Sequence, residues 1–123
     1  MSSHNAEIYF SSIVSLFELS PMVKSIELVK KVSSSTEGYI NLKLALIHNY
    51  TLDFFEYWNN GVVTDYRYNV RDHQDDVLVR WDNARHHPQV STFPDHQHFQ
   101  GDVYAAKRPG LIELLELVTE LWK

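Results

Sequence analysis

The residues Leu52-Asp-Phe-Phe-Glu-Tyr-Trp58, Asn59-Asn60-Gly61 and Val62-Val-Thr-Asp-Tyr-Arg-Tyr-Asn-Val70 form the clearest structural signal in the chain. An Asn-Gly pair accepts positive φ at both positions of a two-residue turn, which makes it a strong signal for a β-hairpin. Side chains alternate along 62–70, so Tyr66 and Tyr68 share one face while Arg67 lies on the other. This region therefore predicts two antiparallel strands joined by a tight turn.

Three more segments on either side of this hairpin show the alternating pattern of strands. They cover residues 26–32, 40–46 and 77–82, and the polar segments 33–38 and 72–76 read as turns. Because short turns force neighbouring strands to run antiparallel, we expect a meander sheet of about five strands.

Apolar residues at spacings of three and four predict a helix near each end of the chain. The first covers residues 6–19 and stops at Ser20-Pro21, and the second covers residues 111–121. Residues 83–110 contain three prolines and two glycines, so we expect a long irregular connection there. The fold class that follows is α+β, with an antiparallel sheet and N-terminal and C-terminal helices in a single domain over residues 1–123.

Composition narrows the function classes. The chain has no cysteine, which excludes disulfides and thiolate catalysis, and its formal net charge is −5, so RNA would have to bind a local surface. No apolar run is long enough for a transmembrane helix, and the N-terminus does not resemble a signal peptide. We expect a cytoplasmic protein with no membrane partner.

Histidines are concentrated in one short segment. Of the seven in the chain, His86, His87, His96 and His98 fall between positions 86 and 98. Imidazole exchanges its proton near neutral pH and is also the commonest metal ligand in proteins. The segment is therefore the predicted site of chemistry.

Metal-free cleavage of RNA is the favoured interpretation of this segment. One imidazole would deprotonate a ribose 2′-hydroxyl and another would protonate the departing 5′-oxygen, while Arg67 or Arg80 stabilises charge on the phosphate. Asp82 would orient an imidazole by accepting its N–H. Further candidates bind the substrate: Tyr66 and Tyr68 by stacking on bases, and Arg85 through its charge.

Two alternatives remain open for the same histidines. In the first, zinc or another divalent metal binds His96 and His98 together with His86 or His87 and with Asp82 or Asp95. In the second, the histidines cap strand ends on a surface loop, and the protein binds a macromolecule without catalysing a reaction. The sequence leaves homo-oligomerisation open as well.

Three blocks in order resemble the TumE family of toxins from toxin–antitoxin systems. They are Tyr66-Arg-Tyr-Asn69, Arg80-Trp-Asp-Asn-Ala-Arg-His-His-Pro88 and Thr92-Phe-Pro-Asp-His-Gln-His98. The chain departs from the family pattern at Arg85, where a proline is expected, and at Asp95 and Gln97, where a histidine and a lysine are expected. The resemblance implies a prokaryotic toxin that inhibits growth and has a cognate antitoxin protein as its partner.

Overall fold

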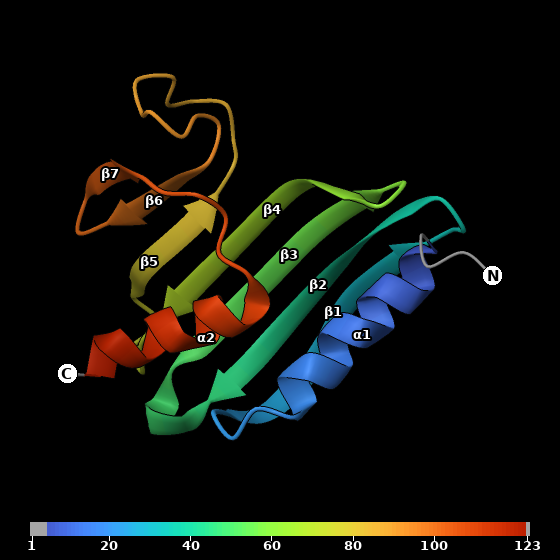
Figure 1. The fold of residues 1–123 in the computed structure, drawn as a ribbon. Helices are drawn as coiled ribbons and strands as arrows, with labels where there is room; N and C mark the ends of the chain where they lie inside the picture. Colours follow the sequence, from blue (N-terminus) through green and yellow to red (C-terminus); the bar gives the residue numbers. More distant parts are fainter. Residues whose placement is uncertain (1–4, 123) are drawn as a thin grey trace.

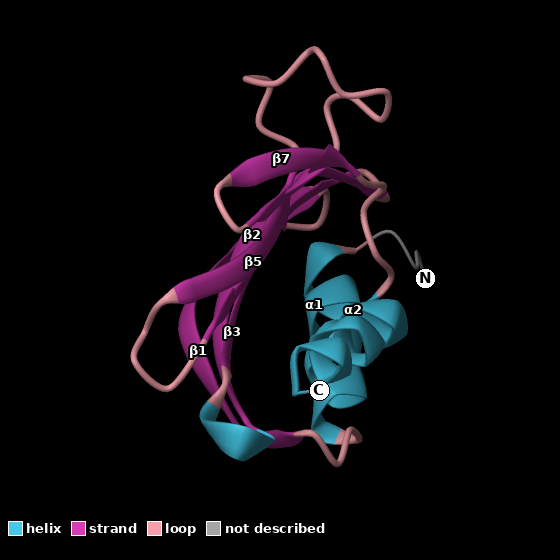
Figure 2. Ribbon diagram, turned by 90° about the vertical axis from the view of Figure 1, so that its left-hand side faces the viewer, coloured by secondary structure: helices cyan, strands magenta, loops and turns pink. Residues whose placement is uncertain are grey.

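The computed structural model describes residues 5–122, and within this range an antiparallel sheet of seven strands carries two α-helices on one of its faces (Figures 1 and 2). The strands are hydrogen-bonded in chain order from β1 to β7. The elements are α1 (Ala6–Glu18), β1 (Val23–Ser33), β2 (Glu37–Leu46), a 3-10 turn (Ile47–Asn49), β3 (Thr51–Asn59), β4 (Val62–Arg71), β5 (Val77–Asp82), β6 (His96–Phe99), β7 (Asp102–Ala105), α2 (Leu111–Thr119) and a second 3-10 turn (Glu120–Trp122).

The β3–β4 hairpin forms where the sequence predicts it. Asn60 and Gly61 both have positive φ, of 48° and 90°, as a two-residue hairpin turn requires. Tyr57 pairs with Asp65 but Trp58 pairs with Val63, so the register shifts near the turn and leaves Thr64 as an extra residue on β4. Beyond this shift, Tyr66 and Tyr68 face the helices and Arg67 faces the opposite side, as predicted.

Both predicted helices are confirmed, and they enclose the core against one face of the sheet. Asn5 caps α1 by accepting hydrogen bonds from two backbone N–H groups of the first turn, and the buried side of α1 includes Phe10 and Phe17. The α2 helix buries Leu114 and Val118. The helices leave the other face of the sheet open (Figure 2).

The expected strand count of about five is wrong, because residues 83–110 contain two more strands. Each of the two is only four residues long, too short for alternation to stand out, and three of the four residues of β6 are polar. The turn between them uses Gln100 and Gly101 at positive φ, of 52° and 83°, and so repeats the geometry of the Asn60-Gly61 turn. His96 and His98 therefore lie on a strand rather than in a loop.

Among the helices of residues 5–122, none combines the length and the apolar character needed to cross a membrane.

Candidate functional site

Strand register brings the predicted residues to one face of the sheet. Arg67 on β4 pairs with Asp82 on β5, which pairs with His96 on β6. Two residues before Asp82 on β5, Arg80 pairs with His98. Side chains on a strand alternate between faces, so all five project from the face that the helices leave open.

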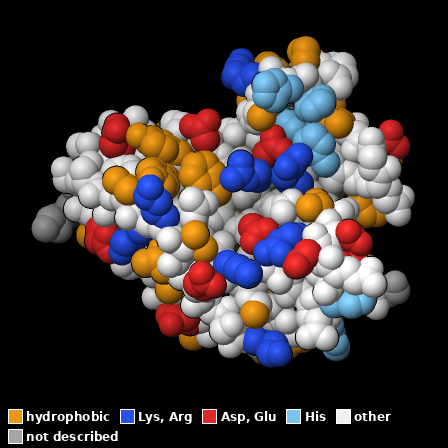
Figure 3. All heavy atoms as spheres, turned by 180° about the vertical axis from the view of Figure 1, so that it is seen from behind, with side chains coloured by type: hydrophobic (Ala, Val, Ile, Leu, Met, Phe, Trp, Pro, Cys, Tyr) orange, Lys and Arg blue, Asp and Glu red, His pale blue; other side chains and the backbone are white. Residues whose placement is uncertain are grey.

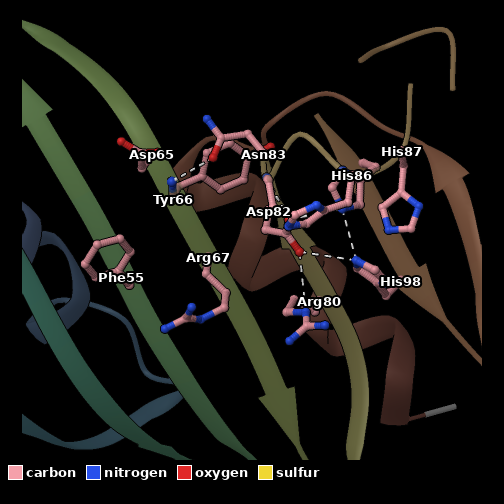
Figure 4. A pocket seen from close by; sticks show the side chains of 12 residues that line it. Phe55, Asp65, Tyr66, Arg67, Arg80, Asp82, Asn83, His86, His87 and His98 are labelled. Atoms are coloured by element: carbon pink, nitrogen blue, oxygen red, sulfur yellow. Dashed lines mark hydrogen bonds and ion pairs between the residues drawn. The ribbon is translucent and has the colours of Figure 1, made fainter. Parts of the chain in front are cut away.

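The connection from β5 to β6 completes a pocket of about 400 Å³ over this end of the sheet (Figure 4). This connection rises beyond the sheet and returns, which places His86 and His87 beside the histidines of β6 (Figure 1). The pocket is lined by Phe55, Asp65, Tyr66, Arg67, Arg80, Asp82, Asn83, Ala84, His86, His87, His96 and His98.

His96 is the most buried histidine of the site, with 1% of its surface exposed. Its Nδ1 lies 2.8 Å from the carbonyl oxygen of Pro94, so this nitrogen carries a proton and donates it to the carbonyl. Its Nε2 lies 3.0 Å from Asp82 Oδ1 and 3.0 Å from His98 Nε2. The ring is therefore held from both sides, with Nε2 directed into the pocket.

Asp82 links the other charged groups of the pocket. Its Oδ2 lies 3.3 Å from His98 Nε2 and 3.4 Å from Arg80 Nε, as the dashed lines in Figure 4 show. Its Oδ1 also accepts a hydrogen bond from the backbone N–H of Ala84, at 2.9 Å, which fixes the start of the connection. Asp82 is 7% exposed and thus places a negative charge among imidazoles in a site shielded from solvent.

His98 is more accessible, since 28% of its side chain is exposed. Partial burial lowers the pKa of His98 below its ordinary value, and the positive charge of Arg80 acts in the same direction. The negative charge of Asp82 opposes both effects without cancelling them. His98 is therefore neutral at neutral pH, which is the state a general base requires.

Three of the histidines also have the arrangement of metal ligands. One nitrogen from each of His87, His96 and His98 lies within 4.8 Å of the others. A metal-binding histidine commonly donates its second ring N–H to a carbonyl or carboxylate, as His96 does to Pro94. Three imidazole nitrogens are a ligand set that zinc takes in proteins. Asp82 lies beside His96 and His98 but outside this group of three.

Tyr66 and Tyr68 occupy positions that do not fit the expected stacking on bases. They are 4% and 0% exposed, because this face of β4 is covered by the helices and the segment that leads to α2. The Tyr66 hydroxyl donates to Asp95 at 2.9 Å, and the Tyr68 hydroxyl donates to buried Glu56. Both tyrosines therefore stabilise the core beneath the pocket.

Arg85 lies beside the pocket rather than in its lining. Its guanidinium carbon is 4.9 Å from the centre of the Phe93 ring, a cation–π contact within the β5–β6 connection. Asp95, an alternative metal ligand in the sequence analysis, instead accepts the hydrogen bond from Tyr66.

Sequence reasoning missed two residues that shape the pocket. Asn83 accepts a hydrogen bond from the backbone N–H of Tyr66 at 3.1 Å and donates one to the carbonyl of Thr64 at 2.9 Å, so it joins the end of β5 to β4. Phe55 lines the pocket from β3, two strands away from Asp82. Residues 52–58 carry apolar or aromatic side chains on both faces of the strand, so the sequence did not show that Phe55 lies opposite the core; the strand order places it beside the histidines.

A family model described as Toxin TumE matches residues 13–122. The class of protein that this match defines is therefore a toxin. The chain is a member of the TumE family, as the three sequence blocks predict. Searches of curated proteins and of solved structures gave no match.

Proposed function

We propose that this protein is the toxin of a toxin–antitoxin pair and that it inhibits growth by cleaving RNA in the pocket between β4, β5 and β6. The observation that carries the proposal is the pairing of Asp82 with His96 and His98, at 3.0 and 3.3 Å, beside two arginines on the same face. General acid–base groups next to fixed cations are what cleavage of a phosphodiester requires.

His98 is the proposed general base. The Nε2 of His98 lies 3.3 Å from Asp82 Oδ2, so in this proposal it carries the ring proton and donates it to the carboxylate. The Nδ1 of His98 is then the basic nitrogen that removes the proton from a ribose 2′-hydroxyl. The 2′-oxygen attacks phosphorus, and the bond from phosphorus to the 5′-oxygen breaks, which yields a 2′,3′-cyclic phosphate.

The remaining pocket residues take complementary roles in this proposal. His86 or His87, which reach the pocket from the β5–β6 connection, protonate the departing 5′-oxygen. Arg67 and Arg80 stabilise the negative charge that develops on the phosphate. Asp82 is a positioning residue, because it acts on the substrate only through the imidazoles that it holds.

Growth assays test the proposal in cells. Expression of the wild-type protein without an antitoxin should arrest growth, and His98→Ala and Arg67→Ala should relieve the arrest. His73→Ala is the matched control, since His73 is an exposed histidine in the β4–β5 turn, outside the pocket. Full toxicity of His98→Ala at wild-type protein levels would refute the assigned role of the pocket.

A metal-dependent hydrolase is the second candidate, favoured by the convergence of three imidazole nitrogens. In this version His87, His96 and His98 would hold zinc as ligands rather than act as acid and base, and the ion would supply Lewis-acid activation of a water molecule. Titration of chelator-treated protein with zinc distinguishes the two. Binding of one zinc ion that His96→Ala abolishes, together with loss of activity in EDTA, would establish the metal version; activity that survives EDTA would exclude it.

The TumE family points to an antitoxin protein as partner. Co-expression with the product of an adjacent reading frame should restore growth and yield a stable complex. If such a complex forms but the free protein never cleaves RNA, the protein is a non-enzymatic binder and the catalytic proposal fails.

A further inference from the structure

The open face of the sheet carries a group of aromatic rings next to the pocket. Tyr39 on β2 lies 6.1 Å from Phe55 and 6.3 Å from Tyr57, both on β3, measured between ring centres. All three are only partly buried, because the helices cover the other face. Figure 3 shows hydrophobic and cationic side chains together on this side of the molecule, beside the histidines. We call Tyr39, Phe55 and Tyr57 the aromatic platform.

Two cations lie directly against the platform. The Nζ of Lys30 is 6.0 Å from the centre of the Tyr39 ring, and the guanidinium carbon of Arg67 is 5.6 Å from the centre of the Phe55 ring. Neither cation forms an ion pair within residues 5–122. Both are therefore available to an anionic partner, although the chain as a whole carries a net charge of −5.

Two acidic side chains on this face already accept hydrogen bonds. Asp53 accepts two hydrogen bonds from Arg71, at 2.7 and 2.9 Å. Glu37 accepts one from the Tyr57 hydroxyl at 2.9 Å, beside the β3–β4 turn and away from the pocket. Asp65, which pairs with Tyr57 and accepts a hydrogen bond from Thr64, adds a negative charge on this face, as does Glu37. The charges that lie over the rings themselves, Lys30 on Tyr39 and Arg67 on Phe55, are positive, which favours a ligand with phosphates over an acidic peptide.

Platform and pocket lie on one line across the sheet. The strand register places Lys30, Asn41, Phe55, Arg67, Asp82 and His96 side by side on successive strands. Neighbouring strands are about 4.8 Å apart, so Phe55 lies only about 10 Å from Asp82. Phe55 and Arg67 also line the pocket itself.

We propose that this face binds single-stranded RNA, with bases stacked on Tyr39, Phe55 and Tyr57 and phosphates at Lys30 and Arg67, so that the strand leads into the histidine pocket. Exposed rings on a sheet stack on unpaired bases without requiring a particular sequence, and neighbouring cations hold the backbone. The inference deepens the proposed function by naming the form of the substrate and its path, and RNA binding is measured separately from cleavage.

Binding of a fluorescent single-stranded 2′-O-methyl RNA, which has no free 2′-hydroxyl to attack phosphorus, tests the platform with the full-length protein. Tyr39→Ala and Tyr57→Ala should each weaken binding by about 5- to 150-fold, the range for loss of one stacked base. Tyr57→Phe should keep the affinity, because the ring remains. Tyr104→Ala is the control, an exposed tyrosine on β7 that lies outside the platform.

Lys30→Ala tests the phosphate contact. For this variant, the slope of log K against log salt concentration should be less steep than for the wild type by about 0.7. Unchanged affinity in both tyrosine variants, with circular dichroism like that of the wild type, would overturn the platform while leaving cleavage in the pocket intact. Tight binding that depends on the rings, with no cleavage of unmodified RNA by the wild type, would support the platform and contradict the proposed function.

Discussion

Asp82 is the residue on which the proposed site depends, because one carboxylate contacts both histidines of β6 and approaches Arg80. Its burial makes these interactions stronger than they would be in water. The adjacent Asn83 fixes the strand end from which Asp82 projects. Asp82 and Asn83 therefore have different functions, although the sequence alone predicts for both that they end a strand.

Asp82→Asn should lower the rate of RNA cleavage while preserving the fold. We expect a loss of about 100-fold or more, in the range that general acid–base groups contribute. The negative charge of Asp82 raises the pKa of His98, so its removal should move the acid limb of the pH–rate profile to lower pH. A reduced rate with an unchanged profile would assign Asp82 a structural role only.

The lowered pKa of His98 predicts how stability depends on pH. In the unfolded chain this histidine has its ordinary pKa of 6.5, so below that pH the unfolded state binds more protons than the folded state. The stabilising contribution is complete above pH 6.5 and is lost as the pH falls through the lowered pKa. Urea unfolding at pH 7.5 and 5.5 should show a larger loss of stability for the wild type than for His98→Gln; equal losses would contradict the assignment.

At the level of elements, the β3–β4 hairpin and the two helices were predictable, because turn chemistry and apolar spacing are local signals. The β6–β7 hairpin was not, since strands of four residues carry too little local pattern and depend on the pairing of β6 with β5 and of β7 with β6. The histidines, Arg67, Arg80 and Asp82 of the pocket could be listed from the sequence, whereas Phe55 and Asn83 could not. Which tyrosines face solvent could not be, because the side on which the helices pack is a property of the whole fold.

Gly38 tests the pairing of β1 with β2. A Cβ atom at this position would lie 2.3 Å from the carbonyl oxygen of Val32 and 2.8 Å from the Cα of Ser33, both backbone atoms of the neighbouring strand. Gly38→Ala should therefore lower the free energy of unfolding by about 1–3 kcal/mol. Gly110→Ala is the control, because a Cβ there meets no atom within 4 Å. Equal stability of the two variants in urea would show that this close approach does not exist.

At the scale of the whole molecule, Glu56 connects three separate parts of the chain. It is fully buried on β3 and accepts hydrogen bonds from Tyr9 of α1, Tyr68 of β4 and Arg108 in the segment before α2. Burial raises the pKa of Glu56 despite these three donors, which lower it. The network ties α1 and the segment before α2 to the strands β3 and β4.

Removal of this carboxylate should destabilise the whole fold. Glu56→Ala leaves Arg108 and two hydroxyls without their acceptor, and we expect the free energy of unfolding to fall by about 3–5 kcal/mol. Glu56→Gln should lose less, since an amide oxygen still accepts. Glu27→Ala, at an exposed position on β1, should change stability by less than about 0.5 kcal/mol. A stable Glu56→Ala variant with normal thermal unfolding would show that the network is not needed.

Cleavage of RNA by the purified protein tests the central claim most directly. An RNA of defined sequence is incubated with wild type, His98→Ala and His73→Ala, and the new ends are analysed. The account predicts fragments with 2′,3′-cyclic phosphate and 5′-hydroxyl ends from wild type and His73→Ala, and none from His98→Ala. Intact RNA after incubation with wild-type protein that arrests growth in cells, or equal cleavage by His98→Ala, would contradict it.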